Sequence, residues 1–208
     1  MEDIKIRKAV LSDIPYFYEI CLKTGNNGKD ATELFSDPYL IGNYFAAPYL
    51  FYSDGICFVA ESENRPQGYI VAVPDTISYF KWMEETWLPP LRERYAKSNT
   101  AQTARSANEE RIFYLIHGKK YPPDDSAKKP NDYPAHFHID LLPSLQGKGI
   151  GSKLMETLYA ELRQRGVPGL HMGVSAANET AVGFYQKLGF TVLKNEEWGF
   201  TMGIKIPN

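Results

Sequence analysis

Apolar and polar positions in the C-terminal half of the chain alternate first with the period of a strand and then with that of a helix. Residues 135–142 have the strand pattern, and residues 152–165 have apolar side chains three and four positions apart, at Leu154, Met155, Leu158 and Leu162. Gly166 and Pro168 end this predicted helix. The remaining pattern predicts a strand, a helix capped by Asn178 and a strand pair, at residues 170–174, 178–186, 191–193 and 199–206.

The N-terminal half predicts the same mixture of elements. Residues 4–10 alternate as a strand, and Ser12 is placed to cap a helix that carries Asp13 and Pro15 in its first turn and ends at Thr24. Two apolar strands follow, joined by a polar turn typical of a hairpin, at residues 56–61 and 67–73. Strands and helices that alternate in this way predict an α/β fold.

The stretch from residue 74 to residue 134 is too long for a plain loop between two strands. Its first part is apolar and aromatic on a broadly helical period, which Pro89 and Pro90 interrupt. The stretch divides into two helical segments and a final loop, at residues 76–95, 109–117 and 121–133.

Composition narrows the possible functions without choosing one. A chain of 208 residues buries a sizeable core, and a formal net charge of −2 gives no electrostatic reason to expect nucleic-acid binding. No apolar run approaches the ~20 residues of a membrane-spanning helix, so neither membrane insertion nor a location outside the cytoplasm is expected. Cys21 and Cys57 lack metal or disulfide spacing, and we expect two small buried hydrophobic side chains and no metal site.

A glycine-rich stretch, residues 146–151, joins the predicted strand at 135–142 to the predicted helix at 152–165. Such a turn leaves backbone N–H groups directed at one place, at the positive end of the helix dipole, and predicts an anion site with phosphate as the favoured anion. Two familiar phosphate motifs do not fit. Lys148 lies between glycines rather than before a Ser or Thr, and the spacing Gly-x-Gly-x-Gly differs from the dinucleotide fingerprint.

Two motifs carry a resemblance to a known family. Gln146-x-x-Gly149-x-Gly151 resembles the acetyl-CoA pyrophosphate loop of the GNAT superfamily of N-acetyltransferases, which reads Gln/Arg-x-x-Gly-x-Gly/Ala. Residues 178–190, which contain Tyr185, are similar to the second signature of that superfamily. The two motifs stand in the order and at the spacing of the family.

The resemblance implies a GNAT fold over residues 1–208 as a single domain. That fold has a mixed, mostly antiparallel central sheet with splayed fourth and fifth strands, helices on both faces and, here, a helical insertion at 74–134 between the third and fourth strands. It also implies acetyl-CoA as co-substrate, without a metal. The residues implied to bind it are Leu141, Leu142, Gln146, Gly147, Lys148, Gly149, Ile150, Gly151, Ser152, Asn178 and Tyr185.

Some of these positions have a second interpretation. Leu141 and Leu142 would act through backbone groups left free where the two strands splay apart, and these groups can also polarise the thioester carbonyl. Asn178 either caps its helix, contacts the pantetheine arm, or does both. Lys148 either adds charge at the pyrophosphate or is solvated.

Residues 68–81 and 87–95 sharpen the resemblance to one branch, the free-standing microbial relatives of the C-terminal acetyltransferase-like domain of O-GlcNAcase. In the animal domain the glycine loop is degenerate, whereas this chain keeps Gln146, Gly149 and Gly151, so we expect cofactor binding here. Nothing in the chain resembles the sugar-hydrolase domain, and hydrolysis of O-GlcNAc is not implied.

The implied function is direct transfer of acetyl from acetyl-CoA to an amine, which can be a small molecule, an amino sugar or a protein lysine. Neither cysteine has a recognisable activating partner, which argues against an acetyl-cysteine intermediate. The alternative is a non-catalytic module that binds CoA or a modified protein. Aromatic residues of the insertion, such as Trp82 and Trp87, either wall an acceptor pocket or pack in the core.

Acetyl transfer needs a base, because an amine with a pKa near ~10.4 is protonated at neutral pH, and an acid for the departing thiolate. The resemblance implies Tyr185 as the acid, with core packing as the alternative role. His138 and Asp140 are the candidate bases. They share one sheet face with His136, because the three residues alternate along one strand.

Asp140 is the favoured base, because an acidic residue inside a strand needs a reason to be there. Its alternative role is a structural carboxylate hydrogen-bonded to a neighbouring loop. His138, and His171 on the next strand, are further candidates that can equally be packed side chains. Two strand histidines without a third ligand do not predict zinc.

Overall fold

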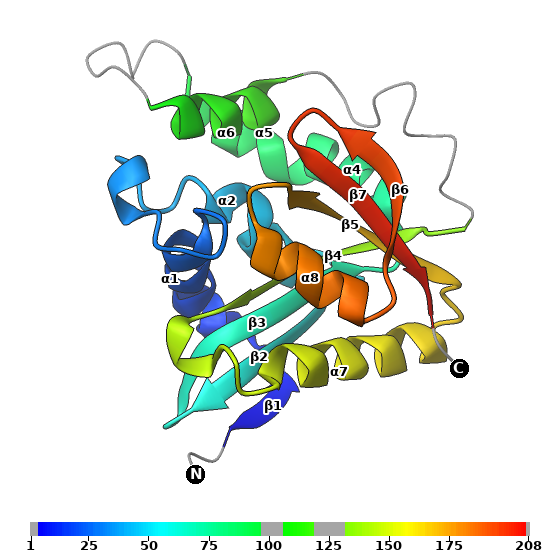
Figure 1. Cartoon of the computed structure of the whole chain (residues 1–208). Helices are drawn as coiled ribbons and strands as arrows, with labels where there is room; N and C mark the ends of the chain where they lie inside the picture. The colour runs from blue at the N-terminus through cyan, green and yellow to red at the C-terminus, as the bar shows by residue number, and fades with distance from the viewer. Residues whose placement is uncertain (1–3, 97–105, 119–131, 207–208) are drawn as a thin grey trace.

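The structure, a computed structural model, describes residues 4–96, 106–118 and 132–206. Its centre is a seven-stranded sheet in the order β1-β2-β3-β4-β5-β7-β6 (Figure 1). The neighbouring strands pair antiparallel except β4 and β5, which are parallel. The expected mixed, mostly antiparallel sheet is therefore confirmed. The strands are β1 Lys5–Lys8, β2 Ile56–Ser62, β3 Arg65–Val73, β4 Ala135–Leu141, β5 Gly169–Ser175, β6 Thr191–Glu196 and β7 Gly199–Lys205.

Helices cover both faces of this sheet. The described α-helices are α1 Ile14–Thr24, α2 Gly42–Phe45, α3 Ala47–Phe51, α4 Thr76–Trp82, α5 Leu88–Arg94, α6 Ala107–His117, α7 Ile150–Gln164 and α8 Glu179–Lys187. Two apolar cores separate them, one between the sheet and α1 to α6, the other between the sheet and α7 and α8. Strand β3 serves both cores, because Tyr69 and Val71 face the first while Ile70 and Ala72 face the second.

The hairpin between β2 and β3 is tighter than the sequence predicts. Glu63 and Asn64 have φ of 53° and 60°, so these two residues alone form the turn, and the strands extend to Ser62 and Arg65 on either side.

Ser12 does not cap the first helix, and that prediction is wrong. It lies in a short 3₁₀ turn, η1 Leu11–Asp13, and the carboxylate of Asp13 organises the turn instead. Asp13 accepts the Val10 backbone N–H at 2.9 Å and forms an ion pair with Arg7 at 2.7 Å. The group that orders this turn is therefore a carboxylate that is paired with an arginine of β1.

The insertion between β3 and β4 is helical, as predicted, but the interruption of the helical period lies before Pro89 and Pro90 and not at them. The chain passes from α4 through a π-helical turn, η3 Met83–Trp87, into α5. Pro89 lies in the first turn of α5, directly after this π-helical turn. The helical period is therefore interrupted just before the prolines, and α5 begins with them. Most of the loop predicted at residues 121–133 lies outside the described residues.

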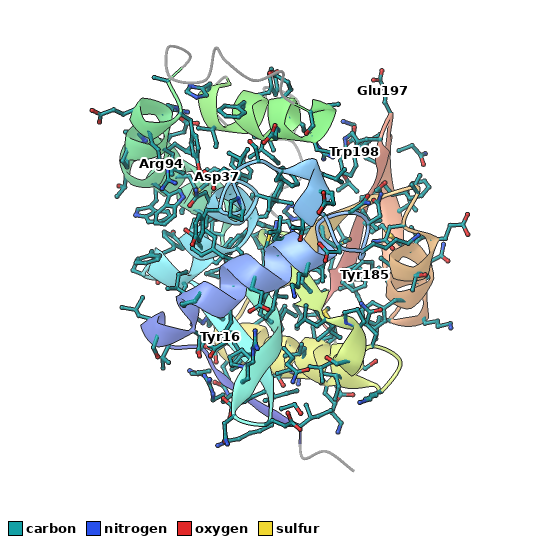
Figure 2. All side chains as sticks on the ribbon, turned by 90° about the vertical axis from the view of Figure 1, so that its left-hand side faces the viewer. Tyr16, Asp37, Arg94, Tyr185, Glu197 and Trp198 are labelled. Carbon is teal, nitrogen blue, oxygen red and sulfur yellow. The ribbon has the colours of Figure 1, made fainter. Side chains whose placement is uncertain are left out.

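Polar contacts tie the insertion to the segment before α2. The buried carboxylate of Glu109 in α6 accepts the backbone N–H and the hydroxyl of Ser36, at 2.7 and 2.6 Å. Next to Ser36, Asp37 accepts the hydroxyl of Tyr95 at 2.6 Å and lies 3.4 Å from the Arg94 guanidinium (Figure 2). The insertion therefore holds in place a segment that has no long helix of its own.

Both cysteines are free thiols, with Cys21 buried and Cys57 partly buried. Burial raises the pKa of Cys57 to about 12, which keeps this thiol protonated and unreactive at neutral pH. Among the helices described, none combines the length and apolar composition needed to cross a bilayer.

Candidate active site

The sheet opens between β4 and β5. These strands pair only at Ala135 with Leu170 and at His136 with His171, and beyond these two pairs they separate. Figure 1 shows α8 lying along the open part of the sheet. The divergence leaves backbone groups of β4 without a partner strand on that side, which is the splay that the resemblance implied.

Alternation along β4 decides which backbone groups face the splay. The Leu142 N–H donates to the Gln67 carbonyl beside β3 at 2.9 Å. Because antiparallel hydrogen bonding alternates, Asp140 also directs its N–H and C=O groups to β3, whereas Ile139 and Leu141 direct theirs into the splay. A free N–H at Leu142 is therefore a wrong expectation. Ile139 is the position that sequence reasoning missed, and strand register would have indicated it.

The glycine loop has the backbone conformation that only glycine adopts easily. Gly147 and Gly149 have φ of 70° and 76°, and a Cβ built on either would meet no atom within 4 Å. Gly149 precedes α7, which begins at Ile150, two residues before the predicted start. The Lys153 N–H donates to the Gly149 carbonyl at 3.2 Å, so the N–H groups of residues 150–152 precede the hydrogen-bonded ladder of α7.

These features fit an anionic group. Space lies open above two left-handed glycines, and N–H donors and the positive end of the α7 dipole are directed into it. Gly151 has a different role, because a Cβ there would lie 3.1 Å from the Phe184 ring and would disturb the packing of α7 on α8. The Gln146 side chain closes the loop, donating from Nε2 to the Leu141 carbonyl at 2.8 Å.

Tyr185 enters the site from α8. Its side chain is buried and packs on Phe137 and Phe190, with ring centroids 5.9 and 5.4 Å away. Burial, and then the negative charge of Asp140, raise the pKa of the Tyr185 hydroxyl, so it stays protonated. The ring packs in the core, and the hydroxyl lies within range of the Asp140 charge.

Asp140 lies on the opposite face of β4 from Phe137. Its Oδ2 accepts the hydroxyl of Tyr69 at 2.6 Å. Burial raises the pKa of the Asp140 carboxyl, and the Tyr69 hydrogen bond opposes that rise. Its described hydrogen-bond partners, Tyr69 on β3 and Thr24 on α1, therefore belong to a strand and a helix and not to a loop. Sequence reasoning missed Tyr69, because the contact depends on which residue of β3 stands opposite Asp140.

Both ring nitrogens of His136 form hydrogen bonds. The Thr76 hydroxyl donates to the Pro134 carbonyl at 2.7 Å and so accepts from Nδ1 of His136, 2.8 Å away. Nε2 then accepts the Tyr49 hydroxyl, also at 2.8 Å. Burial lowers the pKa of this imidazole well below its usual value. His136 is thus a neutral structural residue.

His138 lies between His136 and Asp140 on the same face. The rings of Phe45 and Tyr49 stand edge-on to it at 5.4 and 5.7 Å, and burial lowers its pKa to about 4. His171 places Nδ1 2.7 Å from the Tyr133 carbonyl, which makes it a packed residue. No group of three His, Cys, Asp or Glu side chains among the described residues has the arrangement of a metal site.

Two segments border the splay on the α1 side. Asn178 caps α8 as predicted, accepting the Ala181 N–H at 3.2 Å. A Cβ on Gly28, in the turn after α1, would come within 3.9 Å of the Asn178 amide nitrogen, so that turn approaches the start of α8. The second segment is the turn between β6 and β7. Its Trp198 lies over the backbone of Gly173, where a Cβ would come within 2.6 Å of the ring (Figure 2).

Trp198 is 46% exposed, and no periodic pattern singles it out because it lies in a turn. The aromatic residues of the insertion behave differently. Tyr79 is buried, and Trp82 and Trp87 stack on each other while packing partly buried against the α1 to α6 core. Of the two roles left open for them, core packing is the one observed.

A sheet splayed between β4 and β5, followed by a glycine turn into α7, defines a class of acyl-transferring protein. Residues 28–190 match the Acetyltransferase (GNAT) family, and the chain belongs to that family. Protein O-GlcNAcase of Rattus norvegicus is 26% identical over 200 residues, which cover 92% of this chain. The chain spans about a fifth of that relative's length, 21%.

Other relatives share the fold. [Ribosomal protein bS18]-alanine N-acetyltransferase of Escherichia coli (strain K12) is 30% identical over 111 residues, 53% of this chain and 65% of that protein. The crystal structure of SsHAT superposes with a TM-score of 0.86 at 31% identity, covering 99% of this chain and 100% of the other. The structure of yncA from Salmonella typhimurium with acetyl-CoA matches at a TM-score of 0.55 and 17% identity, over 99% of this chain and 95% of the other. This last match concerns the fold alone.

Proposed function

We propose that this protein transfers an acetyl group from acetyl-CoA directly to an amine. The observation that carries the proposal is the combination of the β4–β5 splay with the loop of left-handed glycines at the start of α7. The unpaired edge of β4 leads along the chain into the anion site at the start of α7. A co-substrate with an amide-containing arm and a pyrophosphate has complementary chemistry.

Bound acetyl-CoA would supply an acyl carbon activated as a thioester. In the proposal, the N–H groups from Gly147 to Ser152 hold the pyrophosphate, with Lys148 adding positive charge. Ile139 offers its backbone N–H and C=O groups to the pantetheine amides, and Leu141 offers its N–H, because the Leu141 carbonyl already accepts from Gln146. An N–H at the splay polarises the thioester carbonyl. Asn178 caps α8 and also borders the splay between β4 and β5.

Asp140 and Tyr185 are proposed as base and acid. A carboxyl whose pKa is raised by burial is a stronger base than an exposed one, and it removes a proton from the amine directly or through water. The Tyr185 hydroxyl, protonated because its pKa is raised, donates to the departing thiolate. His138 is neutral and is the second candidate base.

The acceptor belongs to the class of amines, whether small molecule, amino sugar or protein lysine. One relative is named for acetylating an alanine of a ribosomal protein, which supports a protein amine among these choices. A cytoplasmic setting accompanies the proposal and agrees with the two free thiols.

Titration calorimetry with acetyl-CoA, followed by turnover on a panel of amines and peptides, tests the function. We expect binding and release of free CoA thiol. Absence of heat and of a thermal shift would remove the cofactor assignment. Tight binding without turnover on any acceptor would instead support the alternative, a non-catalytic module that binds CoA or a modified protein. The similarity to O-GlcNAcase over 92% of the chain is the reason to test that alternative.

The proposed base has its own test. Asp140→Asn should lower kcat and abolish the acidic limb of the pH–rate profile, because an amide neither charges nor accepts a proton in this range. A profile identical to that of the wild type would assign the proton transfer to another group.

A further inference from the structure

The carboxylate of Asp140 is held by a tyrosine that is itself fixed in place. Tyr69 stands directly opposite Asp140 in the β3–β4 ladder, and its hydroxyl donates to Oδ2 at 2.6 Å. The Tyr69 side chain is 0% exposed, and its ring stacks on Phe17 of α1 with centroids 4.9 Å apart and an interplanar angle of 18°. The stacked and buried ring therefore has little freedom to move, and the only other described acceptor beside its hydroxyl is the weakly accepting sulfur of Cys21.

The groups around Asp140 come from four elements. Besides Tyr69 on β3, these are Cys21 and Thr24 on α1, His138 on the same face of β4, and Tyr185 on α8. None of these groups carries a positive charge, since burial keeps His138 neutral. The Asp140 charge is therefore stabilised by hydroxyl donors and not by an ion pair.

Tyr69 differs from Tyr49 and Tyr79, two other buried tyrosines on this side of the sheet. Tyr49 uses its hydroxyl on His136, and the Tyr79 hydroxyl has no hydrogen-bond partner within the described residues. Burial and the Asp140 charge hold the pKa of Tyr69 well above its usual range, so this phenol stays a donor throughout the working pH range. Tyr69 can therefore donate its hydrogen bond to Asp140 over this whole pH range.

We propose that Tyr69 is a positioning residue for acetyl transfer: it fixes one oxygen of Asp140, sets the orientation of the carboxylate toward the acceptor amine and sets its strength as a base. The inference rests on the proposed function, in which Asp140 takes the proton. It adds a buried residue that touches neither co-substrate nor acceptor.

Tyr69→Phe tests the inference, because it keeps the ring that stacks on Phe17 and removes only the hydroxyl. Loss of a donor to the charged form should raise the pKa of Asp140 further, by about one unit or more. The acidic limb of the kcat/KM profile should move to higher pH by the same amount. Tyr49→Phe is the matched control, a buried hydrogen-bonded tyrosine on the same side whose partner is His136, and it should leave both quantities unchanged.

The second measurement does not depend on turnover. The carboxyl carbon of Asp140, assigned by NMR against Asp140→Asn, is titrated in the wild type and in Tyr69→Phe. In the wild type the Tyr69 hydrogen bond should also give a deuterium isotope shift at this carbon, which keeps the test valid if the variant does not fold.

The outcomes separate the two proposals. An unchanged carboxyl titration in Tyr69→Phe, or the absence of an isotope shift in the wild type, would overturn the role of Tyr69. A moved titration with an unmoved rate profile would also overturn it, because Tyr69 would then act on a group that is not the base. A wild-type protein that turns over no acceptor, with the titration behaving as expected, would refute the proposed function and leave the coupling between the two side chains intact.

Discussion

Gly149 and Gly166 offer a matched pair of substitutions at the two ends of α7. Gly149 precedes the helix with φ of 76°, and Gly166 follows it with φ of 66°. At both positions a Cβ would meet no atom within 4 Å. An alanine at either site therefore causes the same backbone strain without a clash, and the two variants differ only in what lies beside the added methyl group.

The expected stability cost is the same for both variants. A non-glycine residue in the left-handed region costs about 1–2 kcal/mol. For a chain of 208 residues, each 1 kcal/mol lowers the melting temperature by about 2–4 °C. Gly149→Ala and Gly166→Ala should thus both melt roughly 2–8 °C below the wild type in a thermal denaturation experiment.

The expected binding cost differs. At Gly149 the methyl group occupies the space proposed for the pyrophosphate and prevents a backbone N–H from approaching it. Loss of one hydrogen bond to a charged group costs about 1.5–3 kcal/mol, which weakens acetyl-CoA binding by roughly ten- to 150-fold. Gly166→Ala should bind as the wild type does in calorimetry. Equal weakening in both variants, or normal binding by Gly149→Ala, would refute the assignment of this loop.

Three further predictions concern the acid, the helix cap and acid stability. Tyr185→Phe should lower kcat about a hundredfold or more with little change in acetyl-CoA affinity, because it removes only the proposed proton donor, and an unchanged kcat would exclude that role. Asn178→Ala should reduce the free energy of unfolding in urea by about 1 kcal/mol, and Asn178→Asp, which keeps a capping oxygen, should restore it; equal losses in both variants would contradict the capping role. His138 titrates at about 4 in the folded protein against 6.5 when unperturbed, so its stabilising contribution is present above pH 6.5 and is lost as the pH falls towards 4. Between pH 7 and pH 5 the wild type should therefore lose about 2 kcal/mol more than His138→Asn, a difference that urea denaturation at the two pH values measures and whose absence would contradict the burial of this ring.

Features that depend on local backbone chemistry could be predicted from the sequence. Gly147 and Gly149 adopt the left-handed conformation that a tight strand-to-helix turn requires, and Asn178 caps the helix that follows it. The shared face of His136, His138 and Asp140 follows from strand alternation alone. Each of these inferences needs only a few neighbouring residues.

Features that depend on a distant partner could not be predicted in the same way. The Leu142 N–H is directed at Gln67, and the Asp140 carboxylate meets Tyr69, because of the register between β3 and β4. Ser12 has the composition of a helix cap, but Asp13 organises that turn through its contact with Arg7 on β1. In each case a group remote in the chain decides between locally equivalent possibilities.

The two residue pairs between β4 and β5 have a mechanical consequence. Strands β1 to β4 form one ladder and β5, β7 and β6 form another, and the backbone hydrogen bonds that join them are confined to one end of the junction. The junction therefore has the character of a seam closed at one end, across which the rest of the cohesion comes from side-chain packing. A co-substrate whose amides pair with β4 would lie along this seam as a temporary additional strand. Its binding would therefore add hydrogen bonds to the open end of the junction, and its release would remove them.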